Sequence, residues 1–430
     1  MSGERYVVVG LRRSGVAACE ALARCRPGAE VLAVDRSPDP DVTRLQALGI
    51  EYVTGRDDVN PAGATALVKS PGVPGDAPPV RAARAAGVPV WSEVELAYRL
   101  MDDPRIVGIT GTNGKTTATE LTGAMLRAGG LNVEVAGNVG RALCELPGRV
   151  ARDAWIVCEL SSFQLEDIDR FRARVGVVLN VTPDHLDRHG SMEAYLGAKL
   201  RLLENQAPED TAVLNGDDLL LRAAELPGAG RRVWFDRSES GRIDWQHAVI
   251  RGEHNLENAL AAAAASEAVG VPAAAADAAL RSFHAPPHRL ELVAERAGVA
   301  FVDDSKATNP EATIKALTAF RHGLRLILGG SLKGGSFGPL ADAVAAGPVS
   351  GVHLIGQAAE VIAAELDRAG VAYQRDGDLP TAVAAAAAHA RAGDTVLLSP
   401  ACASFDQFRD YEHRGEEFQR LAGEVSVGGG

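Results

Sequence analysis

Short apolar runs alternate with longer alanine-rich stretches along most of this 430-residue chain. The runs predict strands at residues 6–9, 31–34, 64–68, 106–109, 154–158, 175–180, 299–302, 324–328, 352–355 and 395–398. Polar or turn residues follow the runs, and we expect helices in the stretches between them. This alternation of strand and helix predicts an α/β fold built on parallel sheets.

The length of the chain predicts two or three domains, because one hydrophobic core rarely extends over so many residues. We place a Rossmann-like domain at 1–91, a central P-loop ATPase-like parallel sheet at 92–285 and a C-terminal Rossmann-like domain at 286–430. In the first domain Arg12 stands where a dinucleotide fold has its close-approach glycine. This disfavours a nicotinamide cofactor and leaves a nucleotide diphosphate or a purely structural turn as alternatives.

A glycine-rich turn lies between the strand at 106–109 and a helical pattern, and it reads Gly-Thr-Asn-Gly-Lys-Thr-Thr over 111–117. Gly111 and Gly114 let backbone N–H groups approach phosphate oxygens, Lys115 adds a positive charge, and Thr116 offers a hydroxyl to Mg²⁺. Ile109 replaces the first glycine of a strict P-loop, so the turn predicts a variant phosphate loop. An ordinary glycine-rich turn is the alternative.

Composition narrows the classes of partner. The formal charge is −12 and no dense basic run occurs, which argues against a nucleic-acid surface. The five cysteines are odd in number and scattered, as expected for reduced thiols in a cytoplasm. Because no apolar stretch reaches about 18 residues, we expect a soluble protein with no membrane partner.

Lysine is scarce, since 38 of the 44 basic residues are arginine. The six lysines are Lys69, Lys115, Lys199, Lys306, Lys315 and Lys333. A genome-wide base bias explains the scarcity, but it also makes each remaining lysine a candidate for chemistry that a guanidinium cannot perform. A solvated helical lysine is the alternative interpretation of Lys199.

Polar clusters follow two of the central strands, at 159–164 and 180–185. Ligands gather at the carboxyl ends of parallel strands, so both clusters should face the phosphate loop. Glu159 is expected to hold Mg²⁺ with Thr116, with a buried ion pair as the alternative. His185 and His189 have zinc-like spacing, but Pro183 and Gly190 bracket them, so His185 is interpreted as an active-site imidazole on a metal or a substrate.

Several motifs in order resemble those of the Mur ligases over nearly the whole chain. They are Gly-Thr-Asn-Gly-Lys-Thr-Thr, Glu-Leu-Ser-Ser-Phe-Gln-Leu-Glu, Asn-Val-Thr-Pro-Asp-His-Leu-Asp-Arg-His, Ala-Lys-Leu, Gly-Glu-His-Asn-Leu-Glu-Asn-Ala, His-Arg-Leu-Glu, Asp-Asp-Ser-Lys-Ala-Thr-Asn-Pro and Ser-Pro-Ala-Cys-Ala-Ser-Phe-Asp-Gln-Phe. The last two look most like the D-glutamate-adding branch of the family. The resemblance implies a cytoplasmic, monomeric ligase that uses ATP to join D-glutamate to UDP-N-acetylmuramoyl-L-alanine through an acyl phosphate, in peptidoglycan precursor synthesis.

The resemblance also implies residue roles on the ATP side. Lys115 would hold the β and γ phosphates within the loop Gly111, Thr112, Asn113, Gly114, Thr116 and Thr117. Thr116 and Glu159 would hold one Mg²⁺, and His185 with Lys199 a second. Lys199 matches a lysine that the family carbamylates, a reaction that needs a neutral amine. Asn258 would contact adenine, Arg289 the phosphates, Asp304 the ribose, and Lys306 the substrate phosphates or the acyl phosphate.

The substrate side is implied in the same way. The positions that match D-glutamate contacts are Thr308, Lys333, Ser404, Phe405 and Tyr411. Those that match UDP-sugar contacts are Ser14, Asp35, Arg36, Ser70, Gly137 and Asn138, with Gln164 and His185 toward the muramoyl part. Two departures from the family pattern are Arg12 in the first turn and Ser331 in place of an acidic residue before Lys333.

Two other functions fit parts of the sequence. Another Mur ligase or a folylpolyglutamate synthase would share the phosphate loop, but the N-terminal domain and the acceptor motifs argue against the latter. A nucleotide-gated switch would also share the loop, but it gives no reason to keep Lys199, Lys306 and Lys333 among 38 arginines.

Overall fold

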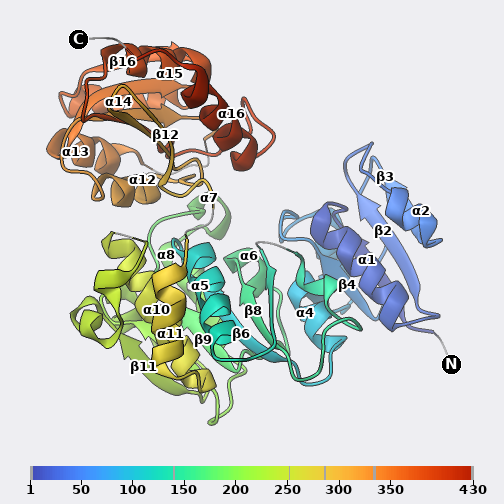
Figure 1. Cartoon of the computed structure of the whole chain (residues 1–430). Coiled ribbons are helices and arrows are strands. Elements are labelled where there is room, and N and C mark those ends of the chain that lie inside the picture. Colours follow the sequence, from blue (N-terminus) through green and yellow to red (C-terminus); the bar gives the residue numbers. More distant parts are fainter. Residues whose placement is uncertain (1–2, 139–140, 251, 285–286, 333–335, 428–430) are drawn as a thin grey trace. The chain divides into compact units, whose positions relative to one another are not determined.

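The computed structural model describes residues 3–138, 141–250, 252–284, 287–332 and 336–427. The chain forms three sheets and divides into two compact units. Unit 1 contains residues 1–181, 191–249 and 255–283, and unit 2 contains residues 182–190, 250–254 and 284–430. Figure 1 shows the first two sheets in blue to yellow and the third in orange to red. Each unit is described by itself below.

The first sheet of unit 1 is parallel and has the strand order β3-β2-β1-β4-β5. Its strands are β1 Arg5–Val9, β2 Glu30–Asp35, β3 Glu51–Thr54, β4 Ala66–Lys69 and β5 Val90–Ser92, and its helices are α1 Arg13–Cys25, α2 Thr43–Ala47, α3 Pro78–Ala85 and α4 Glu93–Arg99. The strand order reverses between β1 and β4. Ligands of open α/β sheets bind at such a reversal, which here lies beyond Val9 and Lys69.

The second sheet of unit 1 is also parallel, with the order β11-β10-β9-β6-β8-β7. Its strands are β6 Arg105–Thr110, β7 Val133–Gly137, β8 Trp155–Glu159, β9 Val175–Val178, β10 Thr211–Asn215 and β11 Arg231–Phe235. The helices of this part of the chain are α5 Lys115–Ala128, α6 Ser162–Leu165, α8 Met192–Leu200, α9 Leu219–Ala223, α10 Glu253–Val269 and α11 Ala273–Ser282. Short 3-10 turns are η1 Leu143–Glu145, η2 Arg201–Leu203, η3 Arg237–Arg242 and η4 Trp245–His247. Strand β6 lies between β9 and β8, so the loop after β6 has polar strand ends on both sides.

Buried polar contacts join the two sheets of unit 1. The carboxylate of Glu95 in α4 accepts hydrogen bonds from the backbone N–H groups of Asp169, Arg170 and Phe171. The Lys69 ammonium at the end of β4 lies 2.8 Å from the Asp167 carboxylate. These contacts fix the first sheet on the second through buried groups that would be costly to leave unpaired.

Unit 2 contains the third sheet, with the order β12-β13-β17-β14-β15-β16, in which only the edge strand β12 is antiparallel among the paired strands described. Its strands are β12 Glu291–Arg296, β13 Val299–Asp303, β14 Leu324–Gly329, β15 Val349–Ile355, β16 Tyr373–Gly377 and β17 Thr395–Leu398. Its helices are α7 Leu186–His189, α12 Pro310–Leu317, α13 Gly338–Ala346, α14 Ala359–Arg368, α15 Leu379–His389 and α16 Tyr411–Glu424. Apolar side chains of β14, β17 and the covering helices form its buried cores.

The predicted α/β class with parallel sheets is confirmed, and each predicted strand overlaps an observed one. The strand predicted at 175–180 is too long, because β9 ends at Val178 and Asn180 turns toward the phosphate loop. The predicted domain limits at 91 and 285 stay predictions.

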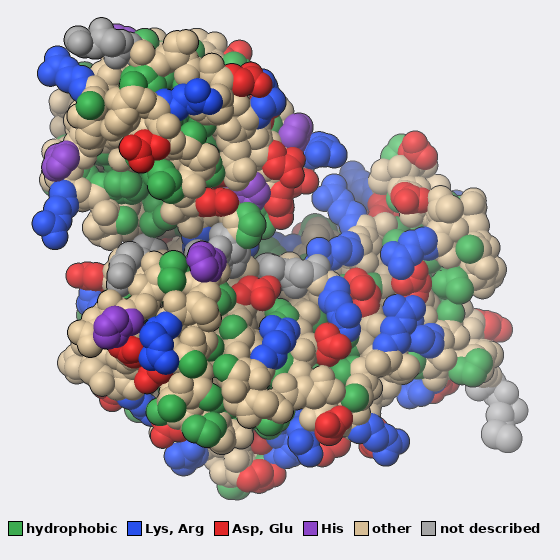
Figure 2. Space-filling view, viewed as in Figure 1, with side chains coloured by type: hydrophobic (Ala, Val, Ile, Leu, Met, Phe, Trp, Pro, Cys, Tyr) green, Lys and Arg blue, Asp and Glu red, His purple; other side chains and the backbone are tan. Residues whose placement is uncertain are grey.

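Three further features concern the apolar character of the helices, the thiols and the surface charge. Among the described residues, no helix combines the length and apolar character needed to cross a bilayer. The five cysteines are free thiols, and Cys19, Cys144, Cys158 and Cys402 are buried. On the face drawn in Figure 2, basic and acidic side chains are interspersed over each unit.

Candidate active site

The phosphate loop occupies the turn between β6 and α5. Gly114 caps α5 with φ 83°, and a Cβ there would lie 2.1 Å from Oδ1 of Asn258. A Cβ on Gly111 would lie 2.9 Å from Cβ of Leu179. Neither position has room for a side chain, and Gly114 also has a left-handed backbone conformation that favours glycine. The loop leaves N–H groups at the start of a helix, where anions bind.

Asn180 braces this loop from the neighbouring strand end. Its Oδ1 accepts hydrogen bonds from the backbone N–H groups of Thr112 at 3.2 Å and Asn113 at 2.9 Å. Its Nδ2 donates to the Asn113 carbonyl at 3.1 Å. Asn180 is not among the site residues predicted from the sequence. The available signal was its place in the polar cluster at 180–185, which is expected to face the phosphate loop.

Two lysines converge on one carbonyl of the loop. The Lys115 Nζ donates to the carbonyl oxygens of Gly111 at 3.0 Å and Thr112 at 2.8 Å. The Lys199 Nζ donates to the same Gly111 oxygen at 2.7 Å. Lys199 is 1% exposed and its Nζ lies 4.3 Å from the centre of the Tyr195 ring. A solvated helical lysine is thus the wrong interpretation of Lys199, and Tyr195, one helical turn before it, is a site residue that the sequence motifs do not identify.

Thr116 and Glu159 meet at the start of α5. The Thr116 hydroxyl donates to Oε2 of Glu159 at 2.8 Å, and Nδ2 of Asn138 donates to its Oε1 at 3.0 Å. Gly137 allows this approach, because a Cβ there would lie 2.2 Å from the Glu159 carbonyl oxygen. These contacts do not form the buried ion pair that was the alternative interpretation of Glu159.

This donor set fits a nucleotide with Mg²⁺. A hydroxyl and a carboxylate side by side are the hard oxygen ligands that Mg²⁺ takes in phosphate-binding loops. The buried Nδ2 of Asn113 has no hydrogen-bond partner within the described part of the chain. A buried donor of this kind is costly unless a ligand or water satisfies it.

The predicted UDP-sugar residues lie at the reversal of the first sheet and at the end of β7. The Asp35 carboxylate accepts from the backbone N–H groups of Leu11 and Ser37, so it shapes the turn that follows β1. The Ser70 hydroxyl donates to the Gly10 carbonyl at 2.7 Å. Around this turn Arg12 and Arg36 are exposed and Ser14 is partly exposed.

Gln164 is held by its own helix. Its Oε1 accepts from the backbone N–H of Ser161 at 3.0 Å, and the Ser161 hydroxyl accepts from the Gln164 N–H at 3.2 Å. The two residues form a capping box at the start of α6. Gln164 is 1% exposed, so a contact with the muramoyl part stays a prediction.

In unit 2, His185 and Thr308 line one pocket together with Ser331, Phe337 and Cys402. His185 has φ 54°, a left-handed conformation that is uncommon outside glycine. Nδ2 of Asn309 donates to the carboxylate of Asp184 at 3.0 Å and so fixes the segment that carries His185. Lys333 lies outside the described residues.

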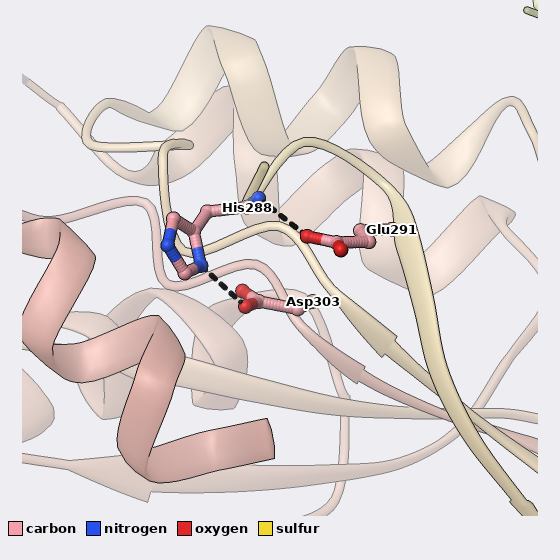
Figure 3. Close-up of side chains that lie close together, drawn as sticks. All are labelled: His288, Glu291 and Asp303. Atoms are coloured by element: carbon pink, nitrogen blue, oxygen red, sulfur yellow. Dashed lines mark hydrogen bonds and ion pairs between the residues drawn. The ribbon is translucent and has the colours of Figure 1, made fainter. Parts of the chain in front are cut away.

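Arg289 lies between two residues with positive φ, His288 at 62° and Leu290 at 46°. Figure 3 shows the His288 ring directed at Asp303, with Nδ1 2.7 Å from Oδ2, while the backbone N–H of His288 donates to Glu291 at 2.9 Å. The hydrogen bond to Asp303 raises the pKa of His288. This network holds the strained turn, and the buried Nε of Arg289 has no hydrogen-bond partner among the described residues.

Asp304 is buried and hydrogen-bonded within unit 2. It is 4% exposed and accepts from the Ser399 hydroxyl at 2.7 Å and the Leu290 N–H at 3.3 Å. Burial raises the pKa of its carboxyl to about 7. Its contact with ribose stays a prediction.

Several residues implied for the acceptor or the acyl phosphate lie at the start of α16, in the turn after β13 or in the turn after β17. The Lys306 Nζ lies 5.2 Å from the centre of the Tyr411 ring, and the Ser305 hydroxyl donates to the Tyr411 carbonyl at 2.8 Å. Ser404 is buried, whereas Phe405 is 68% exposed.

Comparisons with known proteins identify two domains of the chain and its full-length relatives. Residues 109–247 match the Mur ligase middle domain, and residues 288–402 match the Mur ligase, glutamate ligase domain. Two relatives are named UDP-N-acetylmuramoylalanine–D-glutamate ligase. The one from Solibacter usitatus is 45% identical over 98% of each chain. The one from Anaeromyxobacter dehalogenans is 44% identical over 99% of this chain and 98% of its own.

Solved structures show the same fold at low sequence identity. MurF from Acinetobacter baumannii has a TM-score of 0.63 at 16% identity and covers 97% of this chain and 93% of its own. MurF ligase from Thermotoga maritima, solved with ADP, has a TM-score of 0.62 at 17% identity and covers 92% of this chain and 95% of its own. The two matched domains and the full-length relatives above 40% identity show that the chain belongs to the Mur ligase family.

Proposed function

We propose that this chain uses ATP to join D-glutamate to UDP-N-acetylmuramoyl-L-alanine, a step of peptidoglycan precursor synthesis. The relatives of 42–45% identity that carry this activity in their name support the substrates. The structural observation that carries the proposal is the pair of ammonium groups of Lys115 and Lys199 on the Gly111 carbonyl, beside the Thr116–Glu159 contact. A phosphate loop with a second buried lysine suits phosphoryl transfer to a carboxylate.

The proposed reaction has two balanced steps. A carboxylate oxygen of the UDP-linked substrate attacks the γ-phosphorus, and the bond to ADP breaks. The neutral amine of D-glutamate then attacks the acyl carbon, inorganic phosphate leaves, and the nitrogen loses a proton as the amide forms. Both steps gather negative charge on oxygens, so preorganised cations and N–H groups lower the barriers.

The residues of unit 1 would act on the first step. Lys115 would leave the Gly111 and Thr112 carbonyls for the terminal phosphates, while the N–H groups of the loop, braced by Asn180, bind phosphate oxygens. Thr116 and Glu159 would hold Mg²⁺, which when bound neutralises phosphate charge. Asn258, in contact range of Gly114, would lie beside the nucleotide.

Lys199 is proposed to be carbamylated. Lysine, unlike arginine, can lose a proton to give the neutral amine that reacts with CO₂. The modification would turn a cation into an anionic oxygen ligand and reverse the charge beside the loop. We also propose His185 as a ligand of metal or substrate, as the family resemblance implies.

The remaining assignments complete the proposal. Arg289 and Asp304 would bind ATP, and Ser14, Asp35, Arg36, Ser70, Gly137, Asn138 and Gln164 the UDP-sugar. Lys306, Thr308, Lys333, Ser404, Phe405 and Tyr411 would hold the acceptor or the acyl phosphate. We further propose that the protein acts as a cytoplasmic monomer.

The test is phosphate release with ATP, Mg²⁺ and UDP-N-acetylmuramoyl-L-alanine, comparing D-glutamate with L-glutamate, diaminopimelate and L-lysine. Only D-glutamate should accelerate release, and Lys115→Ala should abolish the response because the phosphate loop loses its mobile cation. A response to another amino acid alone would reject the proposed acceptor.

A further inference from the structure

Arg414 is the largest of the fully buried side chains, at 1% exposure, and it lies in the first turn of α16. Its guanidinium donates four hydrogen bonds to two turns. Nε and Nη2 donate to the hydroxyl and carbonyl oxygens of Ser305, at 2.9 and 2.8 Å. Nη1 donates to the carbonyl oxygens of Cys402 at 3.1 Å and Ala403 at 3.3 Å.

These two turns carry Thr308 and Ser404, which are proposed to hold the acceptor, and Lys306, which is proposed for the substrate phosphates or the acyl phosphate. Ser305 precedes Lys306 in the connection from β13 to α12, and Ala403 precedes Ser404 after β17. The Ser305 hydroxyl also donates to the Tyr411 carbonyl, so the start of α16 belongs to the same network. One buried side chain therefore connects the backbone beside Lys306, Ser404 and Tyr411.

The turn after β14 packs against the Ala403 carbonyl and the Arg414 guanidinium. The backbone N–H of Ser331 donates to the Ala403 carbonyl at 2.8 Å. A Cβ on Gly330 would lie 2.2 Å from that oxygen and 3.1 Å from Nη1 of Arg414. The Ala403 carbonyl thus accepts hydrogen bonds both from Arg414 and from Ser331, which lies two residues before Lys333.

The chemistry of arginine suits this position. A planar fork can serve two turns at once, whereas a lysine ammonium has donors at a single atom. Desolvation lowers the pKa of Arg414 to about 10, which still leaves the side chain cationic near neutral pH. The buried charge is solvated by carbonyl dipoles, and it lies beneath residues that would receive an amino acid with two carboxylates.

We propose that Arg414 is a positioning residue that holds the Lys306 and Ser404 turns in the arrangement that binds the acceptor amino acid. This inference rests on the proposed function of the same site. Arg414 makes its contacts with backbone and with Ser305, so it acts through other residues and not on the substrate itself.

The test is steady-state kinetics of Arg414→Lys with each of the three substrates varied in turn. We expect the KM for D-glutamate to rise at least about tenfold, while the KM values for ATP and the UDP-linked substrate change less than about twofold. Ser305→Ala, which keeps the arginine and removes one of its acceptors, should raise the same KM by a smaller factor. It tests the proposal even if Arg414→Lys does not fold.

Arg232→Lys is the matched control. Arg232 of β11 donates to the carbonyl oxygens of Leu226, Pro227, Gly228 and Gly230, so it is also an arginine that organises a turn, but in unit 1. It should leave the KM for D-glutamate unchanged. A loss of thermal stability in Arg414→Lys and Ser305→Ala without a selective rise in this KM would overturn the proposal. Failure of the wild-type protein to respond to D-glutamate would instead reject the proposed function.

Discussion

At the scale of single residues, the phosphate loop depends on amine chemistry that arginine cannot replace. Lys199→Arg keeps the charge and nearly the volume of the side chain, but arginine is always charged and offers no neutral amine to form a carbamate. We expect ligation in this variant to fall by at least about a thousandfold, as for other essential active-site groups. Phosphate release measures the loss, and the thermal midpoint should stay close to that of the wild type.

Lys315→Arg is the control for this change. Lys315 lies in α12 and belongs to none of the motifs, so the same substitution should leave turnover unaltered. Ligation by Lys199→Arg at the wild-type rate would exclude a carbamate at this position.

The left-handed cap of α5 gives a second test at this scale. In Gly114→Ala the new methyl group would lie 2.1 Å from Oδ1 of Asn258, so either the loop or Asn258 must move. We expect ATP affinity to fall by roughly a hundredfold, because N–H groups misplaced by an ångström no longer fit the phosphates. Equilibrium binding of ATP to the full chain measures this effect.

Gly130→Ala separates backbone strain from contact. Gly130 follows the other end of the same helix with φ 81°, and nothing lies within 4 Å of the position that its new methyl group would take. This variant should lose only about 1 kcal/mol of stability, the cost of a left-handed residue, and should bind ATP normally. Equal losses of ATP affinity in the two variants would show that strain alone is responsible.

The site residues differ in how far the sequence predicts them. Glu159 ends β8, and Lys115 and Thr116 begin the helix that follows the neighbouring strand β6, so their meeting follows from parallel-strand topology. Asn180 lies in the polar cluster at 180–185 that is expected to face the loop, although no role was assigned to it. Tyr195, whose hydroxyl lies 3.3 Å from that of Thr112, lies outside the recognised motifs. Arg414 is one of 38 arginines, and its burial depends on two turns more than 100 and about 10 residues away along the chain.

At the scale of elements, the contact between α4 and η1 contains a buried acid. The carboxylate of Glu93 accepts from the backbone N–H of Cys144, while its Oε2 has no partner among the described residues. Burial raises the pKa of this carboxyl from 4.5 to about 7. The folded state therefore binds a proton that the unfolded state has lost, and stability falls as pH rises from about 4.5 through 7.

Glu93→Gln should remove this dependence, because an amide oxygen can accept the Cys144 N–H without ionising. Between pH 5 and 8 the wild-type protein should lose up to roughly 3 kcal/mol relative to the variant. Urea unfolding at several pH values gives the difference, with Glu30→Gln, an exposed position at the start of β2, as the control. Parallel pH curves for Glu93→Gln and the wild type would contradict this assignment.

The elements themselves show where apolar patterning fails. Buried central strands such as β6 and β17 have runs that stand out, and their predicted limits differ little from the observed ones. Edge strands such as β16 were not predicted, because they are defined by pairing in the sheet and not by an apolar run. β16 reads Tyr-Gln-Arg-Asp-Gly and has no fully buried residue. The antiparallel edge strand β12, with two glutamates and an arginine, escapes prediction for the same reason.

At the scale of the molecule, unit 1 unites two sheets that the sequence presents as separate domains. Residues 1–181 belong to one compact unit, held by contacts such as Glu95 with the backbone of 169–171. Lys69 lies at this contact between the first and second sheets. The scarcity of lysine makes Lys69 a candidate for chemistry. Its ammonium is buried against the Asp167 carboxylate, with Glu166 at 3.7 Å, so in the structure it connects the first sheet to the second.

Lys69→Met tests this role. The change keeps the length of the side chain, but among the described residues it leaves Asp167 with only the half-exposed Arg84, 3.2 Å away, as a charged partner. Removing one member of a buried ion pair strands the other charge, so we expect a loss of about 3 kcal/mol in urea unfolding. Lys69→Met with Asp167→Leu should recover most of that loss, because two apolar side chains need no partner. A double variant less stable than Lys69→Met would show that the Asp167 carboxylate joins the sheets through other groups than Lys69.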